Sequence, residues 1–219
     1  MDTQQWLEWL RGTGLQISVA VFVLGLAYRM LHLLLLGRKP NLAEARGSAW
    51  RGGLRTMWHR SLPLGKQTSR GYLILGAGYI FHLGFFIALL FLSQHIALFR
   101  AALGLSWPAL APAWITMAAV LALAAMVALL VQRMIDPVKR LLSDFQDYLA
   151  WTLTFLPLLT GLLLKQSGGA SYQQMLVLHI ASVELLLLAI PFTKLAHMVT
   201  TFSARWYNGA IAGFKGVKV

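Results

Sequence analysis

The sequence predicts an all-α, polytopic membrane protein with five transmembrane helices, an N-terminus outside and a C-terminus in the cytoplasm. The first observation is composition: 58% of the 219 residues are hydrophobic and 12% are charged, with a mean hydropathy of +0.66. The second is that apolar residues form long continuous runs, without the alternation typical of a membrane β-barrel. The third is that basic residues gather on alternate connections between these runs, which indicates the direction of each crossing.

Each apolar run is near the length that crosses the hydrocarbon layer as a helix. The fourth run is short and contains Pro157, so its ends are the least defined. The chain shows no low-complexity tract and no internal repeat of the kind that inverted-repeat transporters carry. We therefore expect one membrane domain over 1–219, with spans at about 16–36, 72–99, 114–131, 148–164 and 175–198.

Fifteen of the nineteen basic residues lie on the side predicted to be cytoplasmic, whereas the outer side receives only Arg11, Arg100 and Lys165. This distribution explains the net charge of +12 as topology, so no nucleic-acid partner is needed. The same basic surfaces suit docking of a partner subunit or contact with anionic membrane lipid, and both interpretations stay open. The cytoplasmic residues are Arg38, Lys39, Arg46, Arg51, Arg55, Arg60, Lys66 and Arg70 in the loop 38–71, then Arg133, Lys139 and Arg140, and finally Lys194, Arg205, Lys215 and Lys218 leading into and along the tail 199–219.

Cysteine is absent from the chain. This excludes disulfides, thiolate metal sites, iron–sulfur clusters held by this chain and covalently attached c-type haem. A bound metal must therefore use histidine, methionine or carboxylate ligands.

The last apolar run, LHIASVELLLLAIPFTKLAHM, carries a histidine near each end. His179 and His197 are eighteen residues apart, which makes about five whole turns of an ideal helix and a rise of roughly 27 Å. On such a helix both imidazoles share a face near opposite sides of the membrane. This spacing favours two haems stacked across the bilayer over one compact metal site.

The second run supplies the histidines that would complete two pairs. Because spans two and five are antiparallel, His95 pairs with His179 towards the outside and His82 pairs with His197 towards the inside. One feature disagrees: His82 and His95 are thirteen residues apart, which places them about 140° apart around an ideal helix. His32 is an alternative inner ligand. The competing interpretation is that these histidines only form hydrogen bonds between helices.

The residues that carry a family resemblance are FHLG around His82, DYLAW and TGLLL in span four, and LHIASVELLLLAIPFTKLAH in span five. Together they resemble the di-haem cytochrome b family of the respiratory nitrate reductase gamma subunit. The longer histidine spacing in span two and the SWPAL loop at 106–110 are more similar to the membrane subunits of sulfite-reduction-associated and heterodisulfide-reductase-like complexes.

The resemblance implies a subunit of the bacterial or archaeal cytoplasmic membrane that holds two haem b groups. Such a subunit exchanges electrons between a quinone near the outer haem and a cytoplasmic iron–sulfur subunit near the inner one, with further membrane or periplasmic subunits in the complex. Quinone chemistry needs proton-exchanging groups near the outer haem, and Arg100, Lys165 and Glu184 are the candidates beside His95. The rival class is a cofactor-free membrane anchor or a transporter whose histidines pack helices or relay protons.

Overall fold

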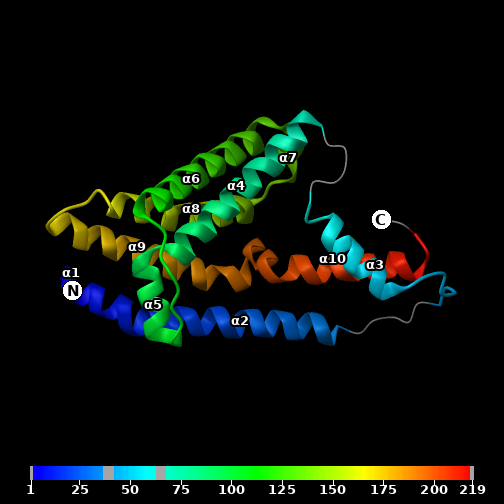
Figure 1. The fold of residues 1–219 in the computed structure, drawn as a ribbon, viewed down its shortest axis with the longest axis horizontal. Helices are drawn as coiled ribbons and strands as arrows, with labels where there is room; N and C mark the ends of the chain where they lie inside the picture. Colours follow the sequence, from blue (N-terminus) through cyan, green and yellow to red (C-terminus); the bar gives the residue numbers. More distant parts are fainter. Residues whose placement is uncertain (1, 37–41, 63–67, 218–219) are drawn as a thin grey trace. The chain divides into compact units, whose positions relative to one another are not determined.

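The computed structural model describes residues 2–36, 42–62 and 68–217. It confirms the predicted fold class, because the described residues form helices and no strand (Figure 1). Five of these helices are long and apolar enough to cross a membrane, at Thr3–Leu35, Ser69–Phe91, Pro112–Ile135, Phe145–Leu164 and Ser171–Phe192. Four residues of the predicted basic surfaces, Arg38, Lys39, Lys66 and Lys218, lie outside the described residues.

The first span consists of α1 (Thr3–Trp9), a π-helical turn (Leu10–Gly14) and α2 (Leu15–Leu35). The second begins as α4 (Ser69–Phe91) and is followed by α5 (Ser93–Leu103). The remaining spans are α6 (Pro112–Ile135), α8 (Phe145–Leu164) and α9 (Ala170–Ala189) with the 3-10 turn Ile190–Phe192. Outside the spans lie α3 (Ala49–His59), α7 (Pro137–Leu142), a second 3-10 turn (Lys194–Ala196) and α10 (His197–Phe214).

The chain divides into two compact units, which are described separately below. The first unit comprises Met1–Ser18 and Ser69–Leu187, and the second comprises Val19–Thr68 and Leu188–Val219.

Helices α4, α6 and α8 form the core of the first unit. A methyl group at Gly84 of α4 would lie 2.9 Å from the Ala122 side chain of α6, so these helices pack closely through small residues, as membrane helices commonly do. Leu123, Met126 and Leu158 complete the buried cluster, and aromatic side chains of α4 and α8 pack around it. Trp151 Nε1 of α8 donates to Met126 O at 2.9 Å and joins the two helices across this cluster.

The second span differs from the single helix predicted over 72–99. Helix α4 ends at Phe91, and the extended backbone of Leu92 separates it from α5. The carbonyl groups of the last turn of α4 are therefore released from helical bonding, and other groups bond them. Trp107 Nε1 donates to Leu90 O at 2.7 Å, and Leu110 N donates to Phe91 O at 3.1 Å. The SWPAL loop thus folds back to cap the broken span.

The fifth span is also interrupted, which corrects the expectation of one continuous helix over 175–198. Helix α9 ends at Ala189, and Thr193 adopts an extended conformation before α10 starts at His197. The physical reason is Pro191, which has no N–H to donate and cannot continue α-helical hydrogen bonding. The argument that five whole turns align His179 with His197 therefore does not hold.

Two residues of α2 pack against this interruption within the second unit. Arg29 Nη1 donates to Pro191 O at 2.6 Å, so this arginine bonds a backbone carbonyl instead of reaching out to the headgroups. A Cβ on Gly25 would lie 2.6 Å from Pro191 Cβ, and glycine therefore gives the proline ring the space it occupies.

Helices α3 and α10 pack against each other through glycines in the second unit (Figure 1). A Cβ on Gly52 would lie 2.6 Å from Gly213 Cα and would also meet Gly209 O. A Cβ on Gly53 would lie 2.6 Å from Trp206 Nε1. At Gly52 backbone approaches backbone, so a side chain there would force the helices apart, whereas at Gly53 the added atom would meet the Trp206 side chain.

Candidate functional site

The structure brings together two of the predicted ligands, His95 of α5 and His179 of α9, both in the first unit. Their ring centroids lie 6.2 Å apart and their planes differ by only 10°. The break at Leu92 is what gives His95 this position, because it places His95 on a different helix from His82. The difference of about 140° in direction between His82 and His95, calculated for one ideal helix, therefore does not apply.

The backbone and side chains around His179 select its protonation tautomer. Thr160 Oγ1 of α8 donates to Leu156 O at 2.7 Å and lies 3.1 Å from His179 Nδ1. Because the threonine hydroxyl hydrogen is directed to Leu156 O, Thr160 Oγ1 accepts from Nδ1–H of the imidazole. This assignment leaves Nε2 of His179 without a hydrogen, which is the form that ligates a metal. Ser182 Oγ lies 3.2 Å from Thr160 Oγ1 and extends this buried polar group.

His95 is held in the same tautomer by the broken end of α4. Its Nδ1 lies 3.0 Å from Ala88 O and 3.1 Å from Leu89 O. Carbonyl oxygens only accept, so Nδ1 carries the hydrogen and Nε2 of the neutral ring has none, as a metal ligand would require. The interruption between α4 and α5 thus supplies the two carbonyl oxygens that orient this imidazole.

The other two predicted ligands show the same local pattern, each within its own segment. His82 Nδ1 lies 2.7 Å from Gly78 O of α4, and His197 Nδ1 lies 3.0 Å from Lys194 O at the start of α10. His82 belongs to the first unit and His197 to the second, so their pairing stays a prediction. All four histidines share an Nδ1–H that donates to protein oxygen.

The centroid separation of the His95–His179 pair is close to the value expected for two imidazoles bound to one metal ion. Two metal–nitrogen bonds of about 2 Å and two nitrogen-to-centroid distances of about 1 Å give a centroid separation of about 6 Å. Gly161 of α8 provides space for the ring, since a Cβ there would lie 3.1 Å from His179 Cε1. No group of three or more His, Cys, Asp or Glu occurs among the described residues, and two axial imidazoles do not require one.

Glu184 lies in α9, five residues beyond His179 in the chain. Its side chain is 6% exposed, and its Oε1 has no hydrogen-bond partner within residues 2–36, 42–62 and 68–217. The carboxylate packs against the π-helical turn of the first span, where a Cβ on Gly14 would lie 2.9 Å from both carboxylate oxygens and 2.8 Å from Trp9. Single π turns in α-helices occur frequently at functional sites.

The other residues singled out from the sequence have separate surroundings. Lys165 follows α8, and its Nζ donates to Thr116 Oγ1 at 2.7 Å. Arg100 lies exposed in the last turn of α5. His32 stacks on Tyr28 one turn earlier in α2, with ring centroids 6.2 Å apart. His59 is exposed at the end of α3.

Sequence reasoning did not identify the residues that support the histidines. Thr160 and Gly161 lie inside the TGLLL motif, and Trp107 lies inside SWPAL, but neither motif by itself shows which ring or carbonyl is contacted. The sequence does contain a signal for this support. The adjacent Thr160 and Gly161 inside an apolar span provide a hydroxyl group and a position without a side chain, which can accommodate a ring from a neighbouring helix.

The fold, with five helices long and apolar enough to cross a membrane, and this site define a multi-pass helical membrane protein with a half-buried, oriented pair of histidines. A protein of Nitratidesulfovibrio vulgaris (strain Hildenborough) is 30% identical over 197 residues, which cover 90% of this chain and 84% of that protein. The chain belongs to the same family as this protein, whose name is given only as "Protein". No model of a known family matches the chain, and no solved structure matches it.

Proposed function

We propose that this protein is a di-haem b membrane subunit that passes electrons between the quinone pool and a cytoplasmic iron–sulfur partner of a respiratory or sulfur-metabolism complex. The observation that carries the proposal is the near-parallel pair His95–His179, with each Nδ1 bonded to protein oxygen and each Nε2 assigned as ligand. His82 and His197 are the proposed ligands of the inner haem.

Haem iron supplies one-electron chemistry by alternating between its ferrous and ferric states. The protein's contribution is to hold two imidazoles in one tautomer and to surround them with apolar helices that exclude water. Outer-shell bonds such as Thr160 to His179 make the imidazole more basic and keep the ring from turning.

Glu184 is the proposed acceptor of a proton from quinol. Oxidation of a quinol releases two electrons and two protons, so a base is needed beside the electron acceptor. Glu184 lies on the same helix as His179, and its buried Oε1 has no hydrogen-bond partner among the described residues, which suits this role. Arg100 and Lys165 stay candidates for holding the quinone oxygens.

The orientation and the partner follow from charge and from the missing cysteine. The excess of basic residues on the loop 38–71 and on the tail 199–219 places both in the cytoplasm. Electrons that leave the inner haem need iron–sulfur clusters, which this chain has no cysteine to hold.

A reduced-minus-oxidised spectrum of the purified protein tests the proposal. We expect a b-type band with about two haems per chain, and one haem fewer in His179→Ala. The control is His59→Ala, which removes an exposed histidine of α3 and should keep both haems. A folded protein without a b-type band would refute the redox function and leave the cofactor-free anchor or transporter as the better account.

A further inference from the structure

Helix α3 exposes a stripe of large apolar side chains. Trp50, Leu54 and Trp58 are four residues apart, so they lie along one face of the helix. Their side chains are 63%, 48% and 68% exposed, whereas the glycine face of α3 packs against α10. Tryptophans exposed in a row on a helix next to a membrane span are typical of segments that lie at the membrane–water interface.

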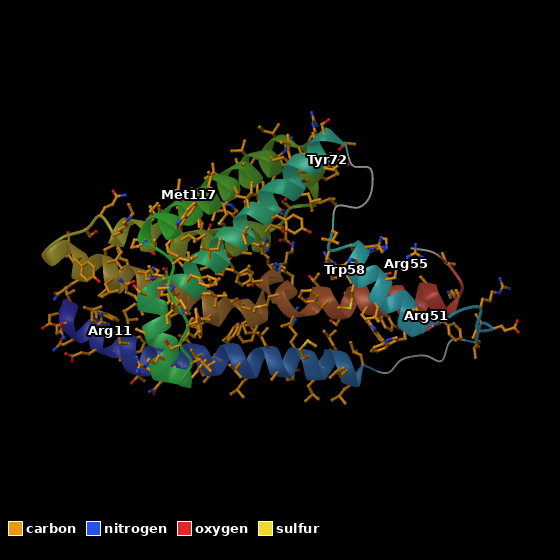
Figure 2. The ribbon with its side chains drawn as sticks, in the orientation of Figure 1. Arg11, Arg51, Arg55, Trp58, Tyr72 and Met117 are labelled. Carbon is orange, nitrogen blue, oxygen red and sulfur yellow. The ribbon has the colours of Figure 1, made fainter. Side chains whose placement is uncertain are left out.

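Two arginines border this stripe on the side of Trp58, between Trp58 and Gly52 around the helix. At about 100° per residue, Arg51 lies some 20° beyond Trp58 around the helix, and Arg55 lies about 40° further. Both arginines are exposed. Figure 2 labels Arg51, Arg55 and Trp58 on α3.

A cavity of about 200 Å³ adjoins the two arginines, between α3 and the end of α10. Ser48, Arg51, Arg55 and Thr56 line it from α3, and glycines of α10 line the other side. The lining therefore includes two arginines, a serine and a threonine, and no Asp or Glu. This donor set suits a phosphate ester.

The charge around the cavity is of one sign. Helices α3 and α10 contain no Asp or Glu, and the second unit has Glu44 as its only acidic residue. The ligand is therefore anionic. Helix α3 ends at His59 and the membrane-spanning helix α4 begins at Ser69, so the two are close along the chain.

We propose that α3 and the end of α10 bind an anionic phospholipid of the adjacent leaflet. Arg51 and Arg55 hold its phosphate at the mouth of the cavity, and Trp50, Leu54 and Trp58 lie at the boundary between headgroups and acyl chains. The aromatic stripe favours a lipid over a soluble protein partner, because it adds an apolar contact directly beside the phosphate-binding arginines. The inference is independent of the haem sites.

The test uses the full-length protein in vesicles of phosphatidylcholine with increasing amounts of phosphatidylglycerol. Because the chain has no cysteine, Leu54→Cys provides a single labelling site for an environment-sensitive dye. We expect the dye emission to move towards that of an apolar environment as phosphatidylglycerol increases. Arg51→Gln with Arg55→Gln should weaken the apparent affinity for phosphatidylglycerol by about 25-fold, or about fivefold per arginine, so that the half-shift is not reached at the phosphatidylglycerol fractions where the wild type responds.

The matched control is Arg70→Gln with Arg140→Gln, which removes the same charge from two exposed arginines of other segments. Its effect should be under about twofold, since neither arginine lines the cavity. Trp58→Ala should weaken the shift without any change of charge. Unchanged circular dichroism and gel-filtration elution would show that the variants fold.

Four results would overturn the proposal. The first is that the dye stays in an aqueous environment in all vesicles, and the second is that the two arginine pairs have equal effects. The third is that soluble glycerol phosphate produces the same shift at similar concentration, which would assign the site to a free phosphate ester. The fourth is that shielding of the dye requires an added protein subunit, which would assign the face to a protein interface.

Discussion

Replacement of Thr160 by valine tests whether the hydroxyl of α8 orients the His179 ligand. Valine has nearly the same shape but leaves Nδ1–H of His179 without its acceptor at 3.1 Å. The site is buried, with Thr160 9% exposed, so an unbonded donor there costs about 1–3 kcal/mol. At 1.4 kcal/mol per factor of ten, this cost corresponds to about a 5- to 150-fold loss of haem affinity. Loss of outer-shell partners in metal sites typically costs about 10- to 100-fold, which agrees.

The assay is a titration of the haem-free protein with haemin, followed by the Soret band, in a His197→Ala background that leaves the outer pair. Thr154→Val is the matched control. Thr154 is also buried in α8 and donates to Ala150 O at 2.8 Å, but no histidine contact is found for it. We expect Thr160→Val to weaken haem binding by at least about fivefold and Thr154→Val to change it by less than about twofold.

Thr160→Ser should retain most of the affinity, because it keeps the oxygen that accepts from Nδ1. If Thr160→Val and Thr154→Val bind haem equally well while both fold, the tautomer assignment is wrong. The outer-shell role of Thr160 would then be refuted, even if His95 and His179 were still found to ligate haem.

Three further predictions follow from close contacts. Gly161→Ala should displace the His179 ring and weaken haem binding, because the added Cβ would lie 3.1 Å from His179 Cε1. The control Gly76→Ala, whose added Cβ would meet no described atom within 4 Å, should leave haem binding unchanged. Gly52→Ala should destabilise the α3–α10 pair by about 1–3 kcal/mol through overpacking, seen as faster trypsin cleavage within α3, and cleavage at the wild-type rate would contradict it. Glu184→Gln should slow haem reduction by quinol about a hundredfold while reduction by dithionite stays unchanged, and equal quinol rates would remove Glu184 from proton transfer.

The interruptions in spans two and five show where sequence periodicity stops being informative. The run from Tyr72 to Phe99 contains no proline and no Asp, Glu, Lys or Arg, so the polar triplet Ser93-Gln94-His95 is its main local sign that α4 ends at Phe91. The break is compensated by groups distant in the chain, namely the Trp107 indole and the Leu110 amide. Pro191, by contrast, was visible in the sequence as a reason for span five to break, and the ideal-helix calculation for His179 and His197 ignored it.

The pairing of His95 with His179 was predicted from topology alone, against the azimuth expected for one helix. Antiparallel spans bring opposite ends of their sequences to the same level, and this holds whether or not a helix is straight. Rotation about the helix axis depends on the backbone of a few residues, here Leu92, and hydropathy does not report it. This is why the level of His95 could be inferred and its direction could not.

Composition and hydropathy by themselves determined that this chain is helical and crosses the membrane five times, because every backbone group in hydrocarbon must be bonded within its own segment. Residue identity also determined which side chains can ligate a metal. Only the tertiary structure decided how those side chains are used: which imidazole nitrogen carries its hydrogen, which glycine leaves room for a ring, and which carboxylate is buried without a partner. These properties depend on atoms brought together from different helices, and the pattern along one helix does not contain them.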